Sequence, residues 1–249
     1  KNPKKNLFFL KKSEYFDDRK LTVQNDTDTI KGISGYARHL NHQDDKVVFN
    51  EFGQFESNEP FSVSVWLNPE GDNGLSKVIL SNVGSKNSLW RGWEMYLDSV
   101  NRSAIRLISS LPHNYIHVKS PEVVPLNKWT HLLFTYDGSA KADGVNIYIN
   151  GKKSPSIVMY DDLYKSILPT NTSRQRDIRG LRMGKSYRTF GGDNGIYKGS
   201  FDELSVFDRE VPSSQVSSIY DQSKSGKKPF IYDRVDKIYK NTGVELSKL

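Results

Sequence analysis

Three short segments of the chain place aromatic side chains beside cationic or hydrogen-bonding ones. A protein that binds sugars stacks aromatic rings on the apolar faces of the sugar and bonds its hydroxyls with Arg, Asn, His or Asp. We expect Trp90 of the first segment, and Tyr187 and Arg188 of the third, to be exposed because they lie in loops. The candidate ligand residues are Trp90 and Arg91 in the first segment, His113, Asn114 and Tyr115 in the second, and Arg182, Tyr187 and Arg188 in the third.

The histidines offer a weaker chemical signal. Only His39 with His42, and His113 with His117, are closely spaced. Zinc would need a third ligand at a recognisable spacing, so the pattern favours solvated histidines. The chain has no cysteine, which excludes disulfides, cysteine-ligated zinc and thiol nucleophiles.

Alternating apolar and polar residues predict the elements that position these side chains. Phe61, Val63 and Val65 share one parity and the residues between them the other, which predicts a half-buried strand. Turn residues separate the runs and a helical period is almost absent, so an antiparallel sandwich is expected. Further strands are predicted at 77–82, 93–97, 105–110, 115–119, 130–136, 145–149, 181–183 and 201–207.

The segment 127–152, NKWTHLLFTYDGSAKADGVNIYINGK, contains two alternating strands joined by a Gly- and Asp-bearing connection. Its Trp129 and His131, the triplet 136–138 and the pair 150–151 resemble the pattern of laminin G (LamG) domains of the concanavalin A-like group. Residues 201–220 resemble the closing strand and short helix of that family. The resemblance implies an all-β jelly-roll sandwich of two antiparallel sheets, in which Trp129 and His131 are structural.

Residues 91–97, the strand and loop at 106–113, and YDGSAKADGV resemble a LamG subtype found in large bacterial proteins with cytochrome-c-like modules. The chain begins with Lys1 and shows no signal peptide, so we interpret it as part of a longer protein. The resemblance implies an extracellular, cell-surface or periplasmic location, and other domains of the parent protein as partners.

The carboxylates do not match a hydrolase. Glucanases on this sandwich carry Glu-x-Asp-x-x-Glu on one strand, so that alternate carboxylates enter the cleft. The only Glu-x-Asp here, at 70–72, lies in a glycine-containing turn and lacks the third carboxylate. We therefore expect no catalytic residues, and a hydrolase would have to use an unfamiliar pair such as Glu94 with Asp98 or Glu203.

The sequence supports a metal site better than it supports a hydrolase site. Asp202 shares parity with Leu204 and Val206, so its carboxylate is expected to point inward with them and to need amide donors or a cation. The LamG resemblance implies a structural calcium held by Asp202 with Asp26 and Asp28. The alternative is that Asp202 accepts hydrogen bonds from a neighbouring turn.

The ends of the chain differ from its middle. We divide the chain into an N-terminal extension (1–25), the LamG-like domain (26–222) and a basic linker with a C-terminal helix (223–249), with short helical extensions at both ends. Pro212 is placed to start one helix, and apolar residues recur at helical spacing from Ile231 to Tyr239.

The formal net charge of +7 comes from scattered Lys and Arg residues. It accompanies no nucleic-acid-binding motif, and no window is apolar enough to span a membrane. The sequence thus predicts a non-catalytic domain that binds a polysaccharide, with an acidic or sulfated one favoured by the charge. A structural or protein-interaction domain without a sugar site is the main alternative.

Overall fold

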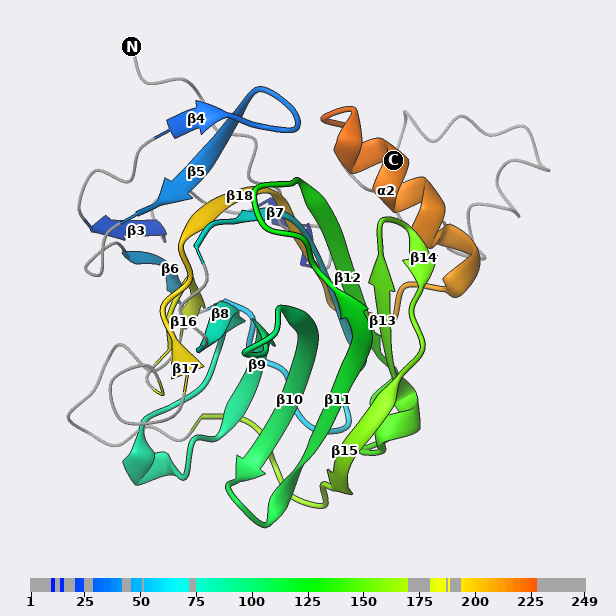
Figure 1. Cartoon of the computed structure of the whole chain (residues 1–249). Helices are drawn as coiled ribbons and strands as arrows, with labels where there is room; N and C mark the ends of the chain where they lie inside the picture. Colours follow the sequence, from blue (N-terminus) through cyan, green and yellow to red (C-terminus); the bar gives the residue numbers. More distant parts are fainter. Residues whose placement is uncertain are drawn as a thin grey trace.

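The computed structural model describes residues 10–11, 14–15, 21–24, 29–41, 46–50, 52–71, 75–169, 180–186, 188 and 194–227. Within these residues the chain forms two packed β-sheets, with one α-helix against the outside of the first (Figure 1). This confirms the predicted all-β sandwich. No helix in the described ranges is long and apolar enough to cross a membrane.

The first sheet follows the order β14-β13-β12-β7-β18-β1-β2, with β5 paired to β18 and β4 to β5. Its pairs are antiparallel except for a single parallel bridge from Leu10 to Phe207. The strands are β1 (Leu10–Lys11), β2 (Glu14–Tyr15), β4 (Thr29–Lys31), β5 (Tyr36–Leu40), β7 (Phe61–Pro69), β12 (Thr130–Tyr136), β13 (Val145–Ile149), β14 (Lys152–Lys153) and β18 (Gly199–Phe207).

The second sheet follows the order β15-β11-β10-β9-β8-β16-β6-β3, and β17 pairs in parallel with β8. Its other pairs are antiparallel. The strands are β3 (Leu21–Gln24), β6 (Lys46–Asn50), β8 (Ser76–Ser81), β9 (Gly92–Leu97), β10 (Arg102–Ser110), β11 (Asn114–Val123), β15 (Ile157–Asp162), β16 (Gly180–Met183) and β17 (Asn194–Gly195).

The main core lies between the sheets. Phe61 is at its centre: it stacks on Phe55 and meets Trp93, Phe134 and Tyr136 at ring-centroid distances of 5.4 to 5.8 Å. Trp93, expected in the core from its alternation with Met95 and Leu97, is fully buried there. The aromatic cluster therefore joins strands from both sheets.

The strand predicted from Phe61 onward is confirmed as β7, but both of its faces are buried, so the prediction that it is half-buried is wrong. The described residues outside the strands include the short 3₁₀ turns η2 (Lys86–Ser88), η3 (Ala142–Gly144) and η5 (Ser213–Gln215) and the α-helix α2 (Val216–Lys224). Helix α2 covers the outer face of β7: Trp66 Nε1 donates to Ser223 Oγ at 2.9 Å. Val216 and Ile219 of α2 pack on Leu133 of β12 in a second apolar cluster.

The helix predicted after Pro212 is confirmed as α2. The predicted N-terminal helix is wrong where the structure describes that segment, because β1, β2 and β3 are strands that extend the two sheets. Sheet edges offer unpaired backbone groups, and pairing satisfies them. The helix predicted at 231–239 lies outside the described residues.

Candidate functional site

A row of polar side chains crosses the outer face of the second sheet. Cross-strand pairing places Arg182 beside Ser81, Ser81 beside Glu94, and Glu94 beside Arg106. The neighbours of these residues along each strand belong to the core, so alternation directs the row outward. We call the following residues the polar row: Arg182, Ser81, Glu94, Arg106, His117 and Tyr160.

Glu94 is the anionic centre of the polar row. Its carboxylate is 0% exposed, and Oε1 accepts hydrogen bonds of 3.1 Å from Arg106 Nη1 and from Arg188 Nη1. A buried carboxylate is tolerated when it is paired and hydrogen-bonded in this way. Two guanidinium groups thus share this one carboxylate oxygen.

Tyr96 lies beside the polar row and contacts two of its members, Arg106 and His117. Tyr96 Oη lies 2.7 Å from His117 Nε2, and Arg106 Cζ lies 4.6 Å from the centre of the Tyr96 ring. A guanidinium at this distance is attracted to the ring by a cation–π interaction. These contacts hold Arg106 and His117 in place at the surface of the sheet.

An aromatic pair ends the row at the sheet edge. The rings of Tyr115 and Tyr160 stack with centroids 4.2 Å apart and an interplanar angle of 11°, and both residues are half-buried. Tyr160 Oη donates to the backbone oxygen of His113 at 3.3 Å, and His113 is exposed. Rigid aromatic rings beside a cationic group are what binding to a sugar requires.

The first predicted segment lies near this end of the sheet. Arg91 Nε donates to the carbonyl of Ser109 at 3.4 Å, which fixes it against the end of β10. Trp90 is half-buried rather than fully exposed, in the loop after η2. The structure thus attaches the first segment to β10 and the second to β11, on neighbouring strands.

The remaining predicted ligand residues have other surroundings. Asn114 is 2% exposed, and its Oδ1 accepts from the Tyr164 backbone N–H at 3.3 Å, which is a structural role. Arg182 is buried within the polar row. Arg188 is buried against Glu94, so it is not the exposed loop residue that was expected. Tyr187 lies outside the described residues.

Several residues of the row were not among the predicted ligands. Arg106 lies on the strand predicted at 105–110, and His117 lies on the strand predicted at 115–119, where it was considered only as a partner of His113. Tyr160 lies on β15, which was not among the predicted strands, and Glu94 was considered only as a hydrolase carboxylate. Their outward parity on strands 93–97, 105–110 and 115–119 was the available signal. The row itself depends on strand order and register.

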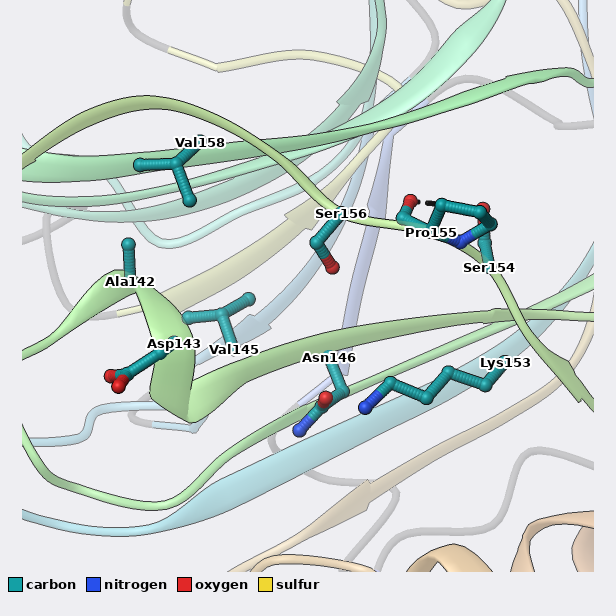
Figure 2. Close-up of a pocket in the computed structure, with 9 residues that line it drawn as sticks. All are labelled: Ala142, Asp143, Val145, Asn146, Lys153, Ser154, Pro155, Ser156 and Val158. Carbon is teal, nitrogen blue, oxygen red and sulfur yellow. Dashed lines mark hydrogen bonds between the residues drawn. The ribbon is translucent and has the colours of Figure 1, made fainter.

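A hollow of about 540 Å³ lies on another part of the surface, between β13 and the segment leading to β15 (Figure 2). Figure 2 shows the carboxylate of Asp143 at one end and the Lys153 side chain at the other, with Val145 between them and Val158 on the strand across from them. No predicted site residue lines it. The hollow borders the edge strands of both sheets.

Asp202 does not point into the core, so that prediction is wrong. Glu203 adopts a φ of +48° and the register with β7 shifts between Asp202 and Ser205, so a bulge breaks the parity. Asp202 pairs with Trp66 on the outer face, and its Oδ2 accepts from the N–H groups of Ile33 and Ser34 at 2.8 and 3.1 Å. The alternative, that Asp202 accepts hydrogen bonds from a turn, describes these contacts.

The donor set for calcium is incomplete in the described residues. Asp202 Oδ1 also accepts from the Glu203 N–H at 2.9 Å, so amide donors already satisfy this carboxylate. Burial and the neighbouring Asp202 raise the pKa of Glu203 to about 8, and neither Glu203 oxygen has a hydrogen-bond partner. The described ranges hold no cluster of three His, Cys, Asp or Glu that could bind a metal, and Asp26 and Asp28 lie outside them.

The three carboxylates considered for a hydrolase have different surroundings. Asp98 accepts hydrogen bonds from the Arg102 side chain at 2.9 Å and from backbone amides, and these donors lower its pKa against the effect of burial. Glu94 is paired with two arginines, and Glu203 belongs to the first sheet. The structure therefore assembles no open pair of carboxylates from the three residues.

Solved structures share this fold at low identity. The chain resembles the botulinum neurotoxin serotype G binding domain with a TM-score of 0.57 and 19% identity, over 80% of this chain and 46% of that one. The binding domain of Paraclostridial Mosquitocidal Protein 1 aligns with a TM-score of 0.52 and 14% identity, over 86% and 50%. The chain thus spans about half the length of these structures.

The CBM40 of the Ruminococcus gnavus IT-sialidase aligns with a TM-score of 0.50 and 12% identity, over 66% of this chain and 83% of that one. No curated protein sequence matches the chain. The Laminin_G_3 family model, described as the concanavalin A-like lectin/glucanases superfamily, matches residues 41–217, which is more than half of the chain. The protein therefore belongs to the concanavalin A-like lectin/glucanase superfamily.

Proposed function

We propose that this domain is a non-catalytic carbohydrate-binding module that holds a polysaccharide against the partly exposed end of the polar row, at Arg106, His117 and Tyr160. The observation that carries the proposal is the stacked pair of Tyr115 and Tyr160. Tyr160 lies in the same cross-strand row as Arg106, and Tyr115 lies beside that row. A sugar ring would stack on the aromatic pair, and the cationic and histidine side chains would bond its hydroxyl or acidic groups.

The electrostatics favour an acidic or sulfated polysaccharide. The chain has a formal net charge of +7, and the Glu94 carboxylate is outnumbered by the arginines that surround it. Attraction of this kind is screened by salt. The similarity in fold to a CBM40 and to neurotoxin binding domains supports a binding role.

A glycan array, followed by calorimetry with the best neutral, acidic and sulfated polysaccharides, tests the function. Tyr160→Ala should weaken binding by about 2- to 10-fold, the range expected for one aromatic contact. Tyr164→Ala is the matched control, because Tyr164 is exposed and does not stack on Tyr115. Trp90→Ala measures whether the adjoining loop takes part.

Binding of an anionic polysaccharide should fall as salt is raised, whereas binding of a neutral one should change little. Failure of every polysaccharide to bind would reject the carbohydrate function. Equal binding by the Tyr160→Ala and Tyr164→Ala variants would reject the polar row as its site.

We also propose an extracytoplasmic location within a larger bacterial protein, supported by the resemblance to a LamG subtype.

A structural calcium held by Asp202, Asp26 and Asp28 is a further part of the proposal, and the oxygens of Glu203 without hydrogen-bond partners offer a further ligand beside Asp202. Calcium should then raise the melting temperature of the wild type but not of Asp202→Asn. Equal melting with calcium and with a chelator would reject the ion.

A further inference from the structure

The hollow between β13 and the segment leading to β15 is separate from the polar row, because none of the polar-row residues lines it (Figure 2). Its volume of about 540 Å³ falls within the range of sites that hold small molecules. The residues that line it are Ala142, Asp143, Val145, Asn146, Lys153, Ser154, Pro155, Ser156 and Val158. They come from η3, β13, β14 and β15 and from the segment between the last two strands.

Hydrogen bonds hold the backbone around the hollow. The Ser154 N–H donates to the Ile147 carbonyl at 2.9 Å, and the Ser154 hydroxyl lies 2.7 Å from that of Ser120. In η3, the Ala142 N–H donates to Asp161 Oδ1 at 2.9 Å. The hollow is therefore formed before a ligand arrives, which lowers the entropic cost of binding.

The middle of the hollow is apolar. Ala142 and Val145 belong to the main core and are buried. Val158, across from Val145 in Figure 2, is 53% exposed. A ligand with an apolar body would remove the Val158 side chain from water, which favours binding.

Opposite charges lie at the two ends of the hollow. Asp143 and Lys153 are both exposed, and the amino end of Lys153 is turned toward the Asn146 side chain (Figure 2). The Lys153 charge also acts on Glu210, where it opposes the rise in pKa that burial and Asp137 cause. Lys153 and Asn146 can thus bind a carboxylate, and Asp143 an ammonium group.

We propose that the hollow binds a ligand whose ammonium and carboxylate groups are joined by an alkyl chain. The carboxylate meets Lys153, the ammonium meets Asp143, and the methylenes cover Val145 and Val158. A free ω-amino acid has this chemistry, and so does the lysine at the C-terminus of a peptide. A dicarboxylate is rejected, because it places a like charge beside Asp143.

An amide NMR titration of the full chain with ω-aminohexanoate tests the proposal. Chemical shifts should change at Val145, Asn146 and Val158 and stay constant at Glu94 of the polar row. Hexanoate and hexylamine should each bind about 2- to 5-fold more weakly, the contribution of one exposed ion pair. Hexanedioate should bind more weakly than hexanoate. Constant shifts around the hollow, or equal binding of ω-aminohexanoate and hexanoate, would overturn the proposal.

Substitutions at the two ends test each charge. Asp143→Asn should bind ω-aminohexanoate no better than hexanoate, and Lys153→Gln should bind it no better than hexylamine. The matched controls are Asp162→Asn and Lys152→Gln, because both residues are exposed and neither lines the hollow. The controls should keep the wild-type preference. The same preference in Asp143→Asn as in Asp162→Asn would reject the role of Asp143.

Exchanging the two charges provides a further test. Asp143→Lys and Lys153→Asp should each abolish the preference for ω-aminohexanoate, and the double variant should restore it, because the ligand can then bind in the reverse direction. No recovery in the double variant would contradict recognition by two opposite charges.

A short peptide that ends in lysine separates the two sources of this chemistry. Binding that weakens by about 2- to 5-fold when the C-terminus is amidated would assign the hollow to peptide C-termini. Binding of ω-aminohexanoate without binding of the peptide would assign it to free ω-amino acids. Both results support the proposed ligand chemistry.

Discussion

Arg188 and Glu94 are 94 residues apart in the chain, yet Arg188 Nη1 donates to Glu94 Oε1 at 3.1 Å in a buried site. Arg188 belongs to the segment between β16 and β17, and Glu94 to the middle of β9. This ion pair holds the Arg188 side chain against the outer face of the second sheet.

Replacing Glu94 should therefore destabilise the fold. Glu94→Ala leaves the buried guanidinium group of Arg188 and the half-buried one of Arg106 without their carboxylate, and we expect a loss of about 3–5 kcal/mol in the free energy of unfolding. Urea unfolding followed by tryptophan fluorescence measures this loss. Glu122→Gln is the control, because Glu122 is exposed and its change should stay within about 0.5 kcal/mol. Equal stability of the two variants would contradict a buried ionic centre.

His131 should make stability depend on pH. Its ring is fully buried, Nε2 lies 2.8 Å from Ser64 Oγ, and burial lowers its pKa to about 3. In the unfolded chain the pKa returns to its usual value of about 6.5. Only the unfolded state then binds the proton between these values, so this contribution to stability is present above pH 6.5 and is lost as the pH falls towards 3.

The variant His131→Gln isolates this effect. The difference in unfolding free energy between wild type and variant should shrink by about 1–2 kcal/mol between pH 7 and pH 5. Urea titrations at the two pH values measure it, and groups shared by both proteins cancel in the difference. A difference that stays constant with pH would show that the proton does not enter at His131.

Helix α2 should be anchored by the hydrogen bond between Trp66 and Ser223 and by its apolar face. Trp66 Nε1 donates to Ser223 Oγ, and the Trp66 ring lies 5.3 Å from the Tyr220 ring between centroids. Ser223→Ala should cost about 1–3 kcal/mol, because it leaves the indole N–H buried without a partner. Ser217→Ala, on the exposed side of the same helix, is the control. Hydrogen exchange should show faster opening of α2 in Ser223→Ala alone.

Gly92 should not tolerate a side chain. Its φ is +140°, and an added Cβ would overlap the carbonyl oxygen of Asn82 on the adjoining segment. We expect Gly92→Ala to lower the melting temperature by more than about 4 °C, the shift that accompanies roughly 2 kcal/mol in a chain of this size. Gly71→Ala is the control for strain alone, because its φ is +66° and no atom lies within 4 Å of the added Cβ.

Local pattern was sufficient for the elements. Alternation located strands such as Thr130–Tyr136 and Val145–Ile149, which the structure confirms. It succeeded because a strand in a sandwich turns one face to the core, so apolar side chains recur at every second residue. It also placed Trp93 in the core. Alternation failed at Asp202, because a bulge inserts one residue and reverses parity without leaving a mark that could be read in a single sequence.

Burial of the second face of β7 and the arrangement of the candidate site depended on tertiary structure. The sequence determined by itself the all-β class, the family resemblance, the helix after Pro212 and the aromatic and cationic residues available for binding. Only the fold decided that α2 covers Trp66, that Arg188 is buried on Glu94 and that Tyr160 joins Arg106 in one row. Parity along a strand is local, whereas strand order, register and the burial of a charge arise from residues far apart in the chain.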